Sequence, residues 1–231
     1  MLNLLRAQMT TSKRYSISVW DISIRLFHWS LVAGIGFMWF SGTEGGNIMV
    51  WHVYIGYCML GLILYRVIWG VVGSPFARFS SFIKGPKNTL LYLKGFIQGK
   101  THDYPGHNPL GGWMVILLLL LVLVQGLTGL FSSDYFFTLG PFYSLVSSKT
   151  ADFLTSIHHL NFNLLLAAIT LHISAVAYHG IIRKEPLVKS MLTGKKVMHQ
   201  PSSESTRPNY IVMLITASIA AGMVSLLLYL T

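Results

Sequence analysis

Long apolar segments separated by polar connectors dominate the hydropathy pattern of this chain of 231 residues. A membrane-spanning helix needs about 20 mostly apolar residues, because it rises about 1.5 Å per residue across a hydrocarbon layer roughly 30 Å thick. A shorter apolar segment at 86–96 begins with proline and is predicted to form an interfacial helix. The pattern predicts five membrane spans, at residues 22–40, 50–72, 109–131, 151–182 and 209–230.

The composition agrees with an integral membrane protein. Hydrophobic residues make up 53% of the chain and charged residues only 10%, whereas a soluble domain is about 25% charged. The single cysteine, Cys58, excludes an intramolecular disulfide and covalent C-x-x-C-H haem attachment. We predict an all-α membrane fold with four parts: a polar tail at 1–20, a four-helix transmembrane bundle at 21–182, a basic connector at 183–208 and an additional C-terminal transmembrane helix at 209–231.

The cationic residues fall on one side of the predicted spans. Of the 17 Lys and Arg residues, 16 lie on the side of the N-terminal tail, and only Lys149 lies on the other. The positive-inside rule then places the N-terminus in the cytoplasm and the C-terminus outside. The net charge of +10 is therefore assigned to orientation and lipid contact, and no nucleic-acid role is expected. The polar first twenty residues predict no cleavable signal peptide.

Four histidines within the spans form two pairs that match in depth. His158 and His172 are fourteen residues apart on the fourth span, so they share a face and stand about 21 Å apart along the axis. Given the predicted orientation, His28 lies toward the inner side with His172, and His52 lies toward the outer side with His158. Ionisable residues inside a membrane are costly and mark functional sites. Paired imidazoles on facing helices predict two axial ligand sets for two b haems: His28 with His172, and His52 with His158.

Three further residues are candidates for contact with these haems. Arg25 and Arg66 lie at the inner ends of spans one and two, where a guanidinium can bind a haem propionate or extend to the lipid headgroups. Gly56 is one turn after His52, where it would give a porphyrin clearance or allow close helix packing. The sequence leaves both alternatives open for each.

The other histidines are given lesser roles. His179 shares a face with His172, but pairing through it would separate the ligands of the fourth span by about 31 Å, the full hydrocarbon thickness. We therefore favour His172 and expect His179 near the membrane interface, beside a haem propionate. His159 is expected to face a loop or to support a neighbouring ligand. Cytoplasmic surface positions are expected for His102, His107 and His199.

Several short motifs carry a family resemblance over residues 18–197. They are RLFHW at 25–29, WHVYIGY at 51–57, RVIWG at 66–70, GHNPLGGWM at 106–114, QGLTGLF at 125–131 and HHLNFNLLLAAITLH at 158–172. With these motifs the chain resembles the bacterial di-haem cytochrome b561 family, which includes the cytochrome b subunits of nickel–iron hydrogenases. The resemblance implies a four-helix bundle with two non-covalent b haems, held by His28, His52, His158 and His172. It also implies exchange with quinone or quinol and with a redox partner.

The expected function is transmembrane electron transfer between the quinone pool and a partner, first a periplasmic cytochrome c. The second candidate partner is a hydrogenase or dehydrogenase subunit, and a third alternative is a stand-alone superoxide- or ferric-type oxidoreductase. The chain has no substrate-oxidising motif of its own. A histidine-based metal transporter would need acidic residues within its spans, whereas Asp21 and Asp152 lie at span ends. A purely structural anchor would not need matched histidines.

Overall fold

The computed structural model describes residues 15–100, 104–136, 138–198 and 207–230, and within these ranges five helices are long and apolar enough to cross a membrane. They agree with the predicted spans to within a few residues. α7 begins three residues earlier than expected because the Ser147 side chain caps it by accepting from the Thr150 backbone N–H. The five helices are α2 (Ile22–Glu44), α3 (Met49–Val72), α6 (Pro109–Gly129), α7 (Ser148–Ile181) and α9 (Tyr210–Tyr229).

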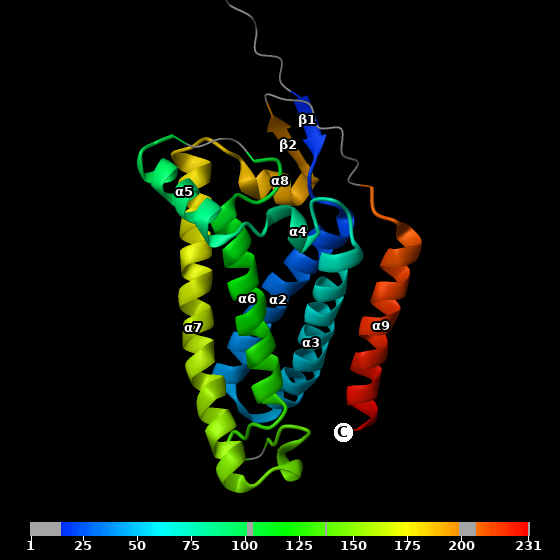
Figure 1. Cartoon of the computed structure of the whole chain (residues 1–231). Helices are drawn as coiled ribbons and strands as arrows, with labels where there is room; N and C mark the ends of the chain where they lie inside the picture. The colour runs from blue at the N-terminus through cyan, green and yellow to red at the C-terminus, as the bar shows by residue number, and fades with distance from the viewer. Residues whose placement is uncertain (1–14, 101–103, 137, 199–206, 231) are drawn as a thin grey trace, which may run out of the picture.

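Helices α2, α3, α6 and α7 form a bundle, and α9 packs outside it against α3 (Figure 1). The bundle core contains Phe27 of α2 and Ile63 of α3, with Leu119 of α6 and Leu165 of α7. α9 approaches α3 closely at Gly61, where an added Cβ would lie 2.6 Å from Val224. The architecture is the predicted all-α one, with a four-helix bundle and one additional transmembrane helix.

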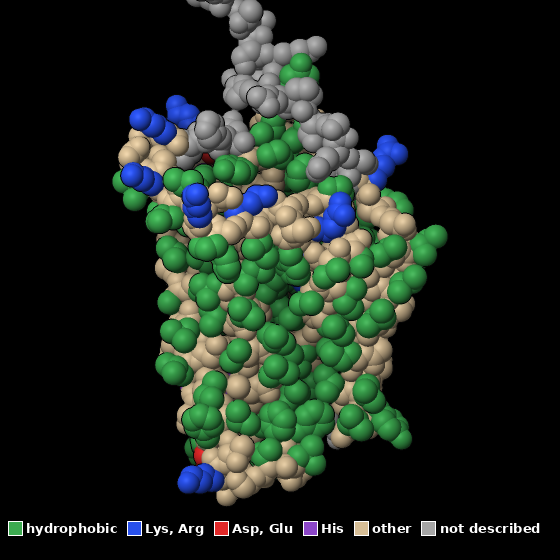
Figure 2. Space-filling view, viewed as in Figure 1, with side chains coloured by type: hydrophobic (Ala, Val, Ile, Leu, Met, Phe, Trp, Pro, Cys, Tyr) green, Lys and Arg blue, Asp and Glu red, His purple; other side chains and the backbone are tan. Residues whose placement is uncertain are grey.

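Short elements gather at one end of the bundle, which we call the basic end (Figures 1 and 2). The helices there are α4 (Phe79–Phe82), α5 (Pro86–Ile97) and α8 (Leu187–Thr193). On the face drawn in Figure 2, Lys and Arg side chains gather at this end, and the opposite end carries fewer of them. The opposite end carries the short connection with η1 (Gly46–Ile48) and the longer one with η2 (Tyr143–Leu145).

A two-stranded antiparallel sheet at the basic end was not predicted from the sequence. β1 (Tyr15–Ser18) pairs with β2 (Lys195–Met198), with Tyr15 opposite Met198. The backbone N–H groups of Val19 and Trp20 extend this pairing by donating to the carbonyl of Gly194 at 2.8 and 3.1 Å. Gly194 has φ +78°, and a Cβ there would lie 2.6 Å from the Trp20 carbonyl oxygen, so the turn requires glycine. The sheet fastens the segment before α2 to the segment after α7.

Candidate functional site: two histidine pairs in the bundle

His52 of α3 and His158 of α7 face each other toward the opposite end of the bundle. Their ring centroids lie 6.5 Å apart, with the ring planes at 64°. A metal–imidazole bond is about 2.0 Å long, so an iron between two imidazoles holds their ring centres roughly 6 Å apart. The separation of these two rings fits a shared metal ion.

Hydrogen bonding fixes the tautomer of His52. Its Nδ1 lies 3.0 Å from the hydroxyl oxygen of Ser41, which is completely buried on α2. That hydroxyl already donates its hydrogen to the Phe37 carbonyl at 2.8 Å, so it accepts from the imidazole. Nδ1 therefore carries the proton, and the lone pair on Nε2 is left for a metal.

His158 is held in the same tautomer by α6. Its Nδ1 lies 3.0 Å from the carbonyl oxygen of Gln125, which can only accept a hydrogen bond. The Thr128 hydroxyl is a second contact at 3.2 Å, and its own hydrogen goes to the Val124 carbonyl at 2.7 Å. Both rings of this pair thus present an unprotonated Nε2, as a metal-binding imidazole must.

Two glycines give these rings their space. A Cβ at Gly42 would lie 3.3 Å from Cε1 of His52, and one at Gly129 would lie 3.1 Å from Cε1 of His158. Gly56, the glycine singled out in the sequence, lies elsewhere: a Cβ there would make an ordinary contact with Met38 of α2 at 3.6 Å. This position fits the helix-packing alternative, and a haem contact for Gly56 remains a prediction.

The second pair, His28 of α2 and His172 of α7, lies toward the basic end. The two imidazoles are close enough for their charges to interact. The His28 ring stands edge-on to Trp29 at 5.0 Å, and its buried Nδ1 has no hydrogen-bond partner. The fourteen-residue spacing on α7 separates the two pairs by about 21 Å along the helix.

The two arginines differ in their surroundings. Arg66 is only 3% exposed, and its guanidinium carbon lies 4.8 Å above the ring of Phe79. An arginine buried in this way does not extend to lipid headgroups, so that alternative is wrong for Arg66. Arg25 donates from Nη2 to the carbonyl of Leu192 in α8. Each still has a buried nitrogen without a partner, Nε of Arg25 and Nη1 of Arg66.

His107 is a site residue that the sequence reasoning missed. It was expected at the surface, but its ring packs against Trp20 at 4.6 Å and Phe82 at 4.8 Å. Burial is the main cause that lowers the pKa of His107 to about 3, and Arg66 makes the largest of the smaller electrostatic contributions. His107 is therefore neutral, and it lies in the electrostatic neighbourhood of the second histidine pair. Its position in a polar connector concealed this burial.

Unsatisfied nitrogen atoms concentrate around this second pair. Within the described ranges, the buried side-chain nitrogens that lack a hydrogen-bond partner are Arg25 Nε, His28 Nδ1, Arg66 Nη1 and His107 Nδ1. Leaving a buried polar group without a partner costs about 1–3 kcal/mol, and more for a charged group. Two arginines and a neutral imidazole suit an anionic oxygen ligand such as a carboxylate. The residues present therefore fit a haem whose propionates point toward the basic end.

The remaining histidines lie apart from the two pairs or outside the described residues. His159 is exposed, with its ring edge-on to His158 at 6.1 Å. His179 pairs with Glu185 rather than with either arginine. His102 and His199 fall outside the described residues. In the part of the chain that the structure describes, no group of three or more His, Cys, Asp or Glu side chains is placed to hold a metal ion.

Paired imidazoles on facing helices of a membrane bundle define the class of b-type cytochromes. The chain belongs to the prokaryotic cytochrome b561 family, whose family model matches residues 19–194. It is similar to a probable Ni/Fe-hydrogenase B-type cytochrome subunit of Rhizobium leguminosarum bv. viciae, with 22% identity over 217 residues, which cover 80% of this chain and 90% of the relative. No solved structure matches the chain. The protein is a multi-pass membrane cytochrome that binds b-type haem and transfers electrons.

Proposed function

We propose that the chain holds two non-covalent b haems and moves electrons across the bacterial inner membrane between the quinone pool and a redox partner. His52 and His158 would hold the outer haem, and His28 and His172 would hold the inner haem. The observation that carries the proposal is the fixed tautomer of both outer imidazoles, 6.5 Å apart. With both axial positions filled by histidine, the haems supply one-electron transfer rather than oxygen chemistry.

The propionates of the inner haem are assigned to the unsatisfied nitrogens at the basic end. Arg66 and Arg25 neutralise the carboxylates, and His107 contributes a neutral hydrogen bond. The orientation follows from the charge distribution: the basic end faces the cytoplasm, the C-terminus is periplasmic, and the opposite end faces the periplasm. Two haems held at these positions would supply one-electron carriers at two depths of the bilayer.

A periplasmic cytochrome c is the first candidate for the partner. The two connections at the opposite end, with the first turns of α7, carry three acids, Glu44, Asp134 and Asp152, against one cation, Lys149. This negative balance favours encounter with a positively charged soluble redox protein. A hydrogenase or dehydrogenase subunit is the second candidate, because the Rhizobium relative is described as a hydrogenase cytochrome subunit. In that case electrons flow from the partner to quinone.

The test is a count of haem per chain together with a reduced-minus-oxidised optical spectrum of the purified protein. We expect about two extractable b haems per chain with low-spin, six-coordinate bands. Anaerobic addition of decylubiquinol should reduce them. A content of one haem per chain would mean that one of the two histidine pairs does not bind haem. The absence of haem would contradict the proposal altogether.

Substituting Ser41 with alanine should weaken the outer haem alone. Ser41→Ala removes the acceptor for the Nδ1 proton of His52, and loss of such a supporting hydrogen bond lowers metal affinity by about 10–100-fold. Haem content should fall toward one per chain when the protein is diluted in detergent. The matched control is Thr43→Ala, because Thr43 makes the same hydroxyl-to-carbonyl bonds on the exposed side of α2. Equal retention of haem by both variants would contradict the role of Ser41.

A further inference from the structure

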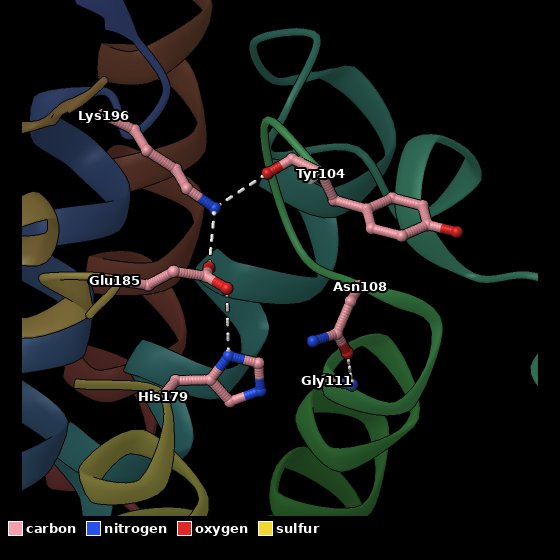
Figure 3. Close-up of polar contacts among 6 residues, drawn as sticks. All are labelled: Tyr104, Asn108, Gly111, His179, Glu185 and Lys196. Atoms are coloured by element: carbon pink, nitrogen blue, oxygen red, sulfur yellow. Dashed lines mark hydrogen bonds and ion pairs between the residues drawn. The ribbon is translucent and has the colours of Figure 1, made fainter. Parts of the chain in front are cut away.

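Three ionisable side chains from separate segments meet at the basic end (Figure 3). His179, near the end of α7, lies with Nδ1 3.4 Å from Oε1 of Glu185. The other carboxylate oxygen, Oε2, lies 3.4 Å from Nζ of Lys196 on β2. The side chains of His179, Glu185 and Lys196 are 14%, 23% and 11% exposed, so they are largely enclosed but retain access to solvent. We call these three residues the His–Glu–Lys cluster.

The backbone holds the cluster in place. The N–H of Glu185 donates to the carbonyl of His179 at 2.9 Å, which folds the chain back after α7. Lys196 donates a second hydrogen bond to the carbonyl of Tyr104 at 2.9 Å. The imidazole of His179 is nearly parallel to the ring of Phe96 on α5, at 6.1 Å. The cluster therefore has a defined geometry.

Glu185 of the cluster acts electrostatically on Tyr92 of α5. Burial is the main cause that raises the pKa of Tyr92 to about 12. Glu185 and Tyr104 raise this pKa further, and Arg183 lowers it. Tyr92 therefore keeps its proton. The titratable or charged residues around His179 from the adjoining elements are Tyr92 of α5, Tyr104 before α6, Tyr178 of α7, Arg183 and Glu185 after α7, and Lys196 of β2. Of these and His179 itself, only His179 has two ring nitrogens, one able to accept a proton while the other donates one.

Stability alone gives a weak reason for this arrangement. Partly exposed ion pairs contribute about 0–1 kcal/mol, and these two have long separations of 3.4 Å. A clamp between β2 and the end of α7 would need only Lys196 and Glu185. The imidazole adds a group that takes up a proton at one ring nitrogen and releases it from the other.

The partly exposed cluster lies nearer the basic end than the inner histidine pair does. His179 is seven residues past His172, on the same face of α7 and about 10 Å nearer the basic end. Lys196 and His172 both lie within electrostatic range of His107. Ionisable side chains thus extend from the enclosed cluster toward the position assigned to the inner haem.

We propose that the His–Glu–Lys cluster carries protons between the cytoplasmic solution and a quinone that reacts at the inner haem; this rests on the proposed quinone function. Oxidation of a quinol releases two electrons, taken up one at a time by the haems, and two protons, which leave through His179 and Glu185. In the reverse direction the same groups supply two protons to a quinone that receives two electrons. The carboxylate of Glu185 stabilises the transient imidazolium, and Lys196 holds the other oxygen of that carboxylate in place.

The test uses the full-length protein with both haems bound. In Glu185→Gln, which keeps the side-chain shape, we expect stopped-flow reduction of the haems by decylubiquinol to slow at least about tenfold. Reduction by dithionite, which supplies electrons without releasing quinol protons, should keep its wild-type rate. His179→Gln should show the same split. The matched control is Lys184→Gln, because Lys184 is an adjacent, exposed cation outside the cluster.

A proton-carrying role predicts rescue, which a purely structural role does not. Added formate or acetate should restore the quinol-driven rate of Glu185→Gln and shift its pH profile. Glu185→Asp, which retains a carboxylate, should keep most of the rate and provides a second variant if Glu185→Gln binds less haem. Quinol-driven rates within twofold of wild type in both Glu185→Gln and His179→Gln would overturn the proposal. If quinol did not reduce the haems of the wild-type protein, the proposed quinone function itself would be contradicted, and the proton-carrying proposal rests on that function.

Discussion

Replacing His52 with alanine is expected to lower the haem content from about two to about one per chain. The imidazole of His52 is fixed by buried Ser41, and its unprotonated Nε2 belongs to a ring 6.5 Å from His158. Alanine leaves His158 as the sole axial ligand on that side of the bundle. The remaining haem should keep its low-spin, six-coordinate bands, because the His28 and His172 pair is about 21 Å away along α7. Haem extraction and low-temperature electron paramagnetic resonance measure both outcomes.

The matched control for this variant is His159→Ala. His159 is adjacent to His158 in the sequence, but it is exposed, so its removal should leave both haems in place. If His52→Ala retained two haems at full occupancy, the outer pair would be wrongly assigned. If both haems were lost together, the two sites would be coupled through folding, and His158→Ala would have to show the same loss.

The second large effect is expected on the inner haem and separates two histidines on the same face of α7. His172→Ala should remove the inner haem and leave the outer one. His179→Ala should retain both haems, because its Nδ1 is paired with Glu185 and its ring packs beside Phe96. The measurement is haem per chain, with redox titration to identify which of the two components is missing. Loss of haem from His179→Ala with retention in His172→Ala would reverse the assignment.

The transmembrane helices were predictable because each depends on local hydropathy. A run of about 20 apolar residues strongly favours a membrane-spanning helix. The observed bounds of α3 and α9 agree with the predicted ones to within one residue. The proximity of His52 and His158 was also predictable. The position of a residue along a membrane-spanning helix gives its depth in the bilayer, and these two histidines were predicted at the same depth. The structure brings these two rings together.

The features that escaped prediction depend on contacts between distant segments. His107 lies in a polar connector, and its burial results from Trp20 before α2 and Phe82 of α4. The pairing of β1 with β2 joins two short strands that lie at opposite ends of the bundle sequence. His179 was expected beside a propionate, but the turn after α7 places Glu185 against it. Neighbours of this kind are set by tertiary structure, which the local sequence pattern does not encode.

The small sheet at the basic end has a consequence for biogenesis. β1 is synthesised before any of the four bundle helices, and β2 follows the last of them. The two strands can pair only after the fourth helix has been inserted and its trailing segment has returned to the side on which synthesis began. Closure of the sheet thus comes after insertion of the complete bundle, and a chain that stops at the end of α7 leaves its first strand without a partner.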